Sequence, residues 1–95
     1  MEHHIKHKEN TTNGIFYIED DHKIVAEMEY VYSSSSEITI NHTEVKPALK
    51  GQGIGVLLLD KTVAFARKNN LKINALCPFV EVQFERDDKY NDVKN

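Results

Sequence analysis

The first half of the chain alternates between hydrophobic and polar positions, which is the pattern of half-buried β-strands. Three segments show it, at residues 14–19, 24–32 and 37–45. In the last of these we expect Ile38, Ile40 and His42 to share one face. Residues 5–9 add a first edge strand on weaker evidence, and the serines at 33–36 suit a turn. The first half therefore predicts four antiparallel strands.

The spacing of hydrophobic residues becomes helical after Pro47. The helical positions are Ile54, Leu57, Leu58, Phe65 and Ala66. They predict a helix over residues 54–69, followed by a short strand at 71–76. Pro78 suits the first position of a second helix, because a proline there gives up no hydrogen bond. The order of elements predicts an α+β fold with two helices packed against a mostly antiparallel sheet.

A chain of 95 residues supports a single core, so we expect one domain spanning residues 1–95. Residues 1–10 are charged and residues 91–95 are polar except for Val93, and we expect both ends to fray. His3, His4 and His7 match no zinc-ligand spacing, so no metal site is expected.

Charge and composition narrow the possible partners. The net charge is −3 and the basic residues are scattered, which gives no reason to expect a nucleic-acid partner. The longest apolar run, 54–59, contains Gly55 and ends at Asp60, so no membrane span is expected. The N-terminus lacks the apolar core of a signal peptide. The single cysteine, Cys77, fits a reducing compartment. We therefore expect a cytoplasmic protein.

A loop with three alternating glycines lies between the fourth strand and the first helix. It reads Lys50-Gly51-Gln52-Gly53-Ile54-Gly55. Glycine allows close approach to a ligand, and the unpaired N–H groups of a helix start attract phosphate. A flexible packing turn is the alternative. The nucleotide P-loop is disfavoured because no Gly-Lys-Ser/Thr follows, and the dinucleotide fingerprint because its glycine spacing differs.

The loop and its flanks resemble the acyl-CoA signature of the GNAT N-acetyltransferase superfamily. The matching residues are Val45-x-Pro47-x-x-Lys50-Gly51-Gln52-Gly53-Ile54-Gly55-x-x-Leu58. Lys50 stands where the family has arginine or glutamine. The runs His42-Thr43-Glu44 and Cys77-Pro78-Phe79-Val80 are similar to the small YjdJ-type branch.

This resemblance implies acetyl-CoA as cofactor, with its pyrophosphate on the backbone of residues 50–55. It also implies a sheet splayed between the fourth and fifth strands, and a Val45 N–H that donates to the oxyanion. The N-terminal helices that shape the acceptor site in larger relatives are missing.

Four residues are candidates for chemistry. His42 could remove the proton of the acceptor amine, and a hydrogen-bonded histidine of the sheet is the alternative. Glu44 could act through water, or be an exposed strand carboxylate. Cys77 ends a strand at a helix start, where a thiol can be activated; it could carry an acetyl group or be a small buried residue. Tyr90 could protonate the departing thiolate, or pack against the second helix.

The sequence therefore predicts an acetyl-CoA-dependent N-acetyltransferase acting on a primary amine. A polyamine, a peptide amine and a small metabolite remain open as acceptors. A CoA-binding module without turnover and a structural adaptor are the alternatives. We expect replacement of Gly53 or Gly55 by a β-branched residue to weaken CoA binding while leaving the fold mostly intact.

Overall fold

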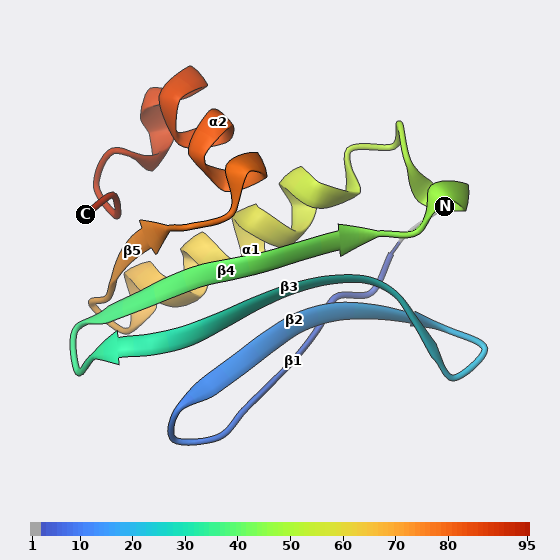
Figure 1. Cartoon of the computed structure of the whole chain (residues 1–95), viewed down its shortest axis with the longest axis horizontal. Coiled ribbons are helices and arrows are strands. Elements are labelled where there is room, and N and C mark those ends of the chain that lie inside the picture. Colours follow the sequence, from blue (N-terminus) through green and yellow to red (C-terminus); the bar gives the residue numbers. More distant parts are fainter. Residues whose placement is uncertain (1–2) are drawn as a thin grey trace.

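The computed structural model describes residues 3–95, which form one five-stranded sheet with two helices (Figure 1). The strands are β1 (Lys6–Glu9), β2 (Asn13–Asp20), β3 (Lys23–Ser34), β4 (Glu37–Val45) and β5 (Lys72–Ala75). The helices are α1 (Ile54–Lys68) and α2 (Pro78–Arg86), and two short 3₁₀ turns are η1 (Pro47–Leu49) and η2 (Asp88–Tyr90). The strands lie in chain order, and β4 and β5 pair in parallel while the other pairs are antiparallel. The predicted α+β class is confirmed.

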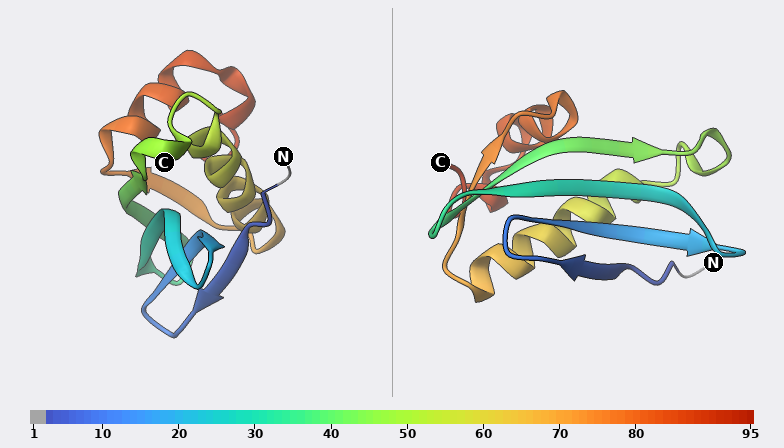
Figure 2. Two further views of the ribbon diagram at one scale, coloured as in Figure 1. Left: turned by 90° about the vertical axis from the view of Figure 1, so that its right-hand side faces the viewer. Right: turned by 60° about the horizontal axis from the view of Figure 1, so that its bottom comes forward.

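Helix α1 covers one face of the sheet, as the two further views show (Figure 2). The side chains between them form the core because the alternating positions of β2, β3 and β4 point toward the helix. The most deeply buried include Met28, Tyr30, Ile38, Ile40 and Leu58. On the opposite face, no helix of residues 3–95 covers strands β1–β4. We call that side of the sheet the outer face.

A β-bulge interrupts β4 at Asn41. Glu29 pairs with His42 and Tyr30 pairs with Ile40, so Asn41 has no partner across the ladder. Ile38 and Ile40 are fully buried, whereas Asn41 and His42 are exposed. The extra residue reverses the alternation, and His42 lies on the outer face. The expectation that His42 shares a face with Ile38 and Ile40 is therefore wrong.

Strand β4 is longer than its partner β5. The parallel pairing ends at Ile40 and Ala75, and the N–H groups of Leu76 and Cys77 both donate to the Ile40 carbonyl at 3.0 and 3.2 Å. Beyond Ile40 the second half of β4 has no β5 partner, because the chain turns into α2 at Pro78. The sheet is thus open on that side of β4, as the family resemblance implies.

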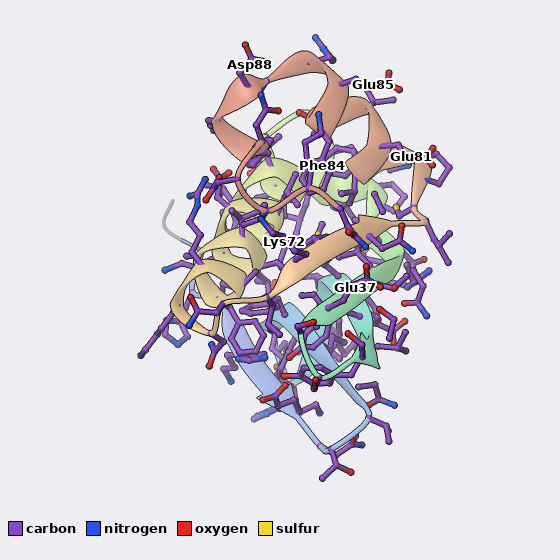
Figure 3. All side chains as sticks on the ribbon, turned by 90° about the vertical axis from the view of Figure 1, so that its left-hand side faces the viewer. Glu37, Lys72, Glu81, Phe84, Glu85 and Asp88 are labelled. Atoms are coloured by element: carbon purple, nitrogen blue, oxygen red, sulfur yellow. The ribbon has the colours of Figure 1, made fainter. Side chains whose placement is uncertain are left out.

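Helix α2 has one buried side. Val80 and Phe84 are buried, and Phe84 points inward from α2 while Glu81 and Glu85 point to solvent (Figure 3). Gly55 of α1 lies against Phe79 of α2, which joins the first turns of the two helices. Neither helix of the described residues is both long and apolar enough to span a membrane.

The C-terminal segment packs against the core, which corrects the expectation that residues 91–95 fray. Val93 is 2% exposed, and its carbonyl accepts the Ile73 N–H at 2.6 Å. The Arg67 guanidinium also binds the Asp92 carboxylate, with Nε to Oδ2 at 2.8 Å. The sequence indicated this packing through Tyr90 and Val93, which are isolated apolar residues in a polar tail.

The N-terminal segment is also ordered from residue 3 within the described chain. The ring of His7 stacks on Phe16 at 4.0 Å between centroids, and its Nε2 lies 2.6 Å from the Tyr30 hydroxyl oxygen. The Tyr30 O–H donates to Glu9, so the His7 ring is the donor to that oxygen. Burial lowers the pKa of His7, which favours the neutral ring. His7 therefore fixes the edge strand β1, and only residues 1–2 of the predicted frayed end lie outside the description.

Candidate functional site

The glycine loop ends in a helix start that no side chain caps. Gly51 and Gly53 have φ angles of 85° and 73°, in the left-handed region that favours glycine. Gly53 is the N-cap residue of α1, without a side-chain cap and without an acidic residue in the first turn. The free N–H groups and the positive end of the helix dipole therefore meet open space, which suits an anion.

Gly55 has a different role from the other two glycines. It lies inside α1, and a Cβ added there would come within 2.7 Å of the Phe79 ring. The glycine is needed to admit Phe79 and not to adopt a special backbone conformation. This corrects the expectation that replacing Gly55 leaves the fold intact.

A pocket of about 210 Å³ lies in front of this loop. Its wall consists of Val45, Leu49, Lys50, Gly51, Gly53, Ile54, Gly55, Val56 and Phe79. The apolar side chains come from four elements: the end of β4, η1, α1 and α2. Lys50 is the one charged residue among them. A site of this kind can hold an uncharged chain along its wall and a phosphate at the helix start.

The unpaired half of β4 leads into this pocket. The Lys46 N–H donates to the Val25 carbonyl in β3 at 2.9 Å. Consecutive N–H groups of a strand point to opposite edges. The Val45 N–H is therefore directed to the edge that β5 has left, where it can donate to a ligand.

Cys77 closes the same opening from the other side. Its thiol is 7% exposed, and Sγ lies 3.3 Å from the Thr43 hydroxyl oxygen of β4. The residue is the N-cap of α2, with no side-chain hydrogen bond to the helix. Thr43 is half-buried and pairs with Met28, so the contact lies on the face that α1 covers.

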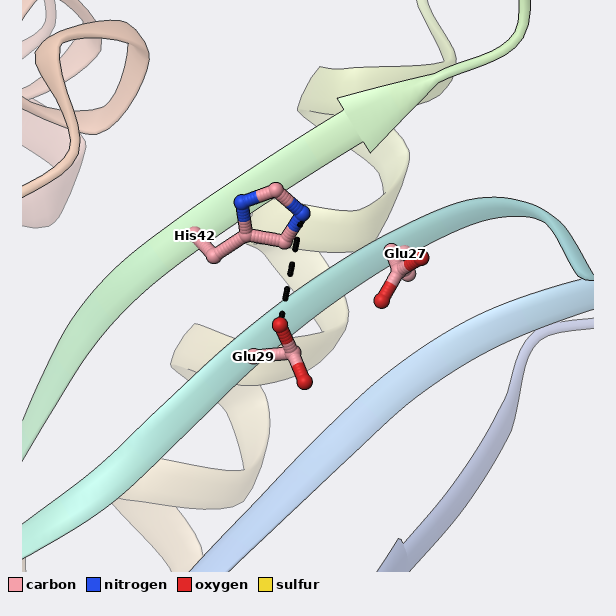
Figure 4. Close-up of side chains that lie close together, drawn as sticks. All are labelled: Glu27, Glu29 and His42. Carbon is pink, nitrogen blue, oxygen red and sulfur yellow. Dashed lines mark ion pairs between the residues drawn. The ribbon is translucent and has the colours of Figure 1, made fainter.

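His42 lies on the outer face beside Glu27 and Glu29 (Figure 4), and Glu44 is a third carboxylate near it. Its Nε2 is 4.0 Å from a carboxylate oxygen of Glu29 and 4.0 Å from one of Glu44. One ligand atom of each of Glu27, Glu29 and His42 lies within 4.8 Å of the others. His42 and Thr43 are neighbours in β4 and point to opposite faces. The structure therefore places the His42 ring and the Cys77 thiol on opposite faces of the sheet.

Tyr90 is a buried residue that packs against α2 and binds Asp60 of α1. Its side chain is 2% exposed, its ring lies 5.3 Å from that of Phe84, and its hydroxyl donates to the Asp60 carboxylate at 2.7 Å. Burial, together with this carboxylate, raises the pKa of Tyr90 well above its usual range. This geometry favours the packing alternative over the role of acid.

Sequence reasoning missed three features of this site. They are the bulge at Asn41, the contact of Thr43 with Cys77, and the ring of Phe79 against Gly55. The last had a signal, because Gly55 lies inside a helix, where glycine is unfavourable without a packing reason. The bulge had no comparable signal in the alternation of β4.

Comparisons with known proteins identify the class. The profile of the GCN5-related N-acetyl-transferase family matches residues 15–93, and the chain belongs to this family. A GCN5-like candidate N-acetyltransferase from Staphylococcus aureus, solved by NMR, is 41% identical over 95% of this chain and 87% of its own length, with a TM-score of 0.74. No curated protein matches the chain.

Two larger structures share the fold at lower identity. One is a GNAT family acetyltransferase from Elizabethkingia anophelis with acetyl-CoA bound, 17% identical over 84% of this chain, with a TM-score of 0.63. The other is an aminoglycoside acetyltransferase from an uncultured soil sample in complex with sisomicin, 21% identical over 81% of this chain, with a TM-score of 0.63. This chain spans 54% and 57% of their lengths. The fold is thus GNAT-like in a minimal form.

Proposed function

We propose that this protein transfers an acetyl group from acetyl-CoA to a primary amine. One observation carries the proposal: the uncapped start of α1 and the unpaired edge of β4 open into the same pocket. The residues fit CoA, because the loop offers N–H groups to a pyrophosphate and the pocket wall offers apolar surface to the pantetheine arm. Family membership and the acetyl-CoA bound to the Elizabethkingia relative support the same cofactor.

Each part of the site has a role in this proposal. Lys50 and the backbone of residues 50–55 hold the pyrophosphate, with Gln52 in the loop. The cofactor, when bound, supplies an acetyl thioester. The Val45 N–H donates to the thioester oxygen as negative charge develops there. His42 takes the proton of the acceptor amine from the outer face, where its Nε2 lies 4.0 Å from a carboxylate oxygen of Glu29 and of Glu44.

The route of the acetyl group has two alternatives. In direct transfer the amine nitrogen bonds to the acetyl carbon, the carbon–sulfur bond breaks, and CoA leaves as the thiolate. In the other, the Cys77 sulfur first displaces CoA, and the amine then displaces Cys77. The buried thiol, with its hydrogen bond to Thr43, favours direct transfer.

A CoA-binding module without turnover is the second candidate. The chain spans little more than half of the larger relatives, and no helix of residues 3–95 covers the outer face. For both candidate functions we propose a cytoplasmic location. We also propose that the chain belongs to the small YjdJ-type branch, and its likeness to the Staphylococcus aureus protein of similar length supports this.

Calorimetric titration with acetyl-CoA, alongside an assay of thiol release with an amine panel, tests the proposal. Binding with amine-dependent release supports the transferase, and loss of release in His42→Ala with CoA binding retained supports its role as base. Binding without release by any amine supports the module. No binding of CoA refutes both.

A further inference from the structure

A second hollow, of about 430 Å³, opens on the outer face. Its wall includes Lys8, Glu9, Ile15, Glu29, Val31 and Asn41, and His42 lies beside Glu29 just outside it. It shares no residue with the pocket in front of the glycine loop. Asn41 is the bulge residue, so one end of the hollow lies where β4 becomes unpaired. A molecule in this hollow would approach that opening from the face opposite α1.

The strand register arranges charge along this hollow in a single row. Lys8 pairs with Ile15, Ile15 pairs with Glu29, and Glu29 pairs with His42. Neighbouring strands lie about 4.8 Å apart, so Lys8 and Glu29 are separated by roughly 10 Å along the sheet. The row therefore runs from a cation, over an apolar side chain, to a carboxylate beside an imidazole.

The two charges at the ends of the row are available to a ligand. Among the described residues, Lys8 has no carboxylate within 4.0 Å, and its Nζ lies over the Tyr17 ring at 5.1 Å. Within residues 3–95, His42 is the one basic side chain within 4.0 Å of the Glu29 carboxylate, and the Glu29 side chain is 47% exposed. Lys6, on the same strand, is different because Glu19 already neutralises it at 2.7 Å.

We propose that the hollow binds the acceptor and selects an aliphatic ω-amino carboxylate. The carboxylate lies against Lys8, the methylene chain crosses Ile15, and the amine lies between Glu29 and His42. The hollow has the size of a small-molecule site. A linear diamine would instead place its second cation beside Lys8. This inference rests on the proposed transferase function, since His42 is the base that takes the amine proton.

The test compares three acceptors with the same six-carbon chain: 6-aminohexanoate, hexylamine and 1,6-diaminohexane. We expect kcat/KM to be highest for 6-aminohexanoate, by roughly two- to fivefold over hexylamine, because exposed ion pairs have this strength. In Lys8→Gln that ratio falls to about one, and in Lys8→Glu the diamine becomes the preferred acceptor. Lys6→Gln is the matched control, in which the ratio stays as in the unmodified protein.

Equal or better use of hexylamine or the diamine by the unmodified protein would refute the inference and leave the transferase intact. So would an unchanged ratio in Lys8→Gln. If CoA binds but no amine is acetylated, the transferase proposal fails by itself. NMR titration of the CoA-saturated protein then tests whether the hollow binds an ω-amino carboxylate. If it does, 6-aminohexanoate shifts the Ile15 and Glu29 amide resonances at a lower concentration than hexylamine does. Equal or absent shifts refute the inference.

Discussion

Gly51, Gly53 and Gly55 alternate along the loop, yet single-residue geometry separates them. Gly51 and Gly53 need positive φ angles, and nothing lies within 4 Å of a Cβ placed on either. Gly55 has no positive φ angle, and its constraint is the Phe79 ring. Sequence spacing treated the three as equivalent because it records residue type and not the surroundings of the Cα atom.

The contact between Gly55 and Phe79 predicts that Gly55→Ala destabilises the protein when Phe79 is present and stabilises it when Phe79 is removed. Gly55→Ala should lower the free energy of unfolding by about 1–3 kcal/mol, because the new methyl group overpacks against the ring. In the Phe79→Ala background the same change should raise it by about 0.5–1 kcal/mol, since alanine is the better helix residue. Urea denaturation of the four proteins measures both values. The same cost in both backgrounds would rule out Phe79 as the reason for the glycine.

Tyr90 offers a second test at this scale. Tyr90→Phe removes the hydrogen bond to the Asp60 carboxylate, and we expect a loss of about 1–2 kcal/mol in unfolding free energy. Because the hydroxyl is buried and bound, the rate of acetyl transfer should change little at a temperature where the variant is folded. Thermal denaturation and steady-state kinetics measure the two effects. A large fall in kcat with unchanged stability would restore Tyr90 as the acid.

Among the elements, strand β1 is held by a shared carboxylate. The Glu9 carboxylate accepts hydrogen bonds from the hydroxyl groups of Tyr30 and Tyr32, with oxygen–oxygen distances of 2.7 and 2.8 Å. Burial, followed by this carboxylate, raises the pKa of Tyr32 to about 12 and that of Tyr30 further. These tyrosines keep their protons in the folded state at a pH where they ionise in the unfolded chain.

The sign of this linkage predicts alkaline sensitivity. The stabilisation is complete below about pH 10, the unfolded pKa of tyrosine, and is lost as the pH rises toward 12. Urea midpoints measured from pH 8 to 11.5 should fall above pH 10. Tyr32→Phe should make the decline shallower, because one of the shifted groups is gone. A midpoint that stays constant up to pH 11.5 would contradict the assignment.

The C-terminal segment that packs on the core gives a fourth test of stability. Val93→Ala should lower the free energy of unfolding by about 2 kcal/mol, because Val93 is 2% exposed in the segment that pairs with β5. Val82→Ala in α2 is the matched control, since Val82 is 44% exposed and should change stability by less than about 0.5 kcal/mol. Chemical denaturation compares them. Similar effects for both would mean that the segment does not contribute to the core.

The sequence predicted the elements well where burial repeats regularly. The bounds of β4 matched residue for residue, and α1 and α2 began at Ile54 and Pro78 as expected. It failed where one residue changes the register, because Asn41 looks like any polar strand position until β3 is placed beside it. The same holds for the candidate site. The glycine loop could be predicted from its local pattern, whereas the side of the sheet on which His42 lies depends on how β4 pairs with β3.

Across the whole molecule, the sheet separates the two proposed sites. One side carries α1 and the pocket proposed for the cofactor, and the outer face carries His42, three carboxylates and the hollow proposed for the acceptor. The two meet where β4 continues past the end of β5. In the proposed transferase, donor and acceptor would therefore bind on opposite faces of the sheet and meet at this opening.

This arrangement predicts where CoA changes amide hydrogen exchange. The Val45 N–H points to the edge of β4 that β5 has left, and the Ile54 and Gly55 N–H groups lie at the uncapped start of α1, so bound CoA should slow their exchange directly. The Ile15 amide belongs to the ladder between β1 and β2, and the Val31 amide to the ladder between β3 and β4. Both should change only as far as overall stability rises. NMR-detected exchange with and without CoA measures both groups in one experiment. Uniform slowing would show only global stabilisation, whereas protection confined to the outer face would place the cofactor on the wrong side of the sheet. Slowing concentrated at β4 and the first turn of α1 would establish that the opening between β4 and β5 holds the cofactor, because no other surface carries both groups of amides.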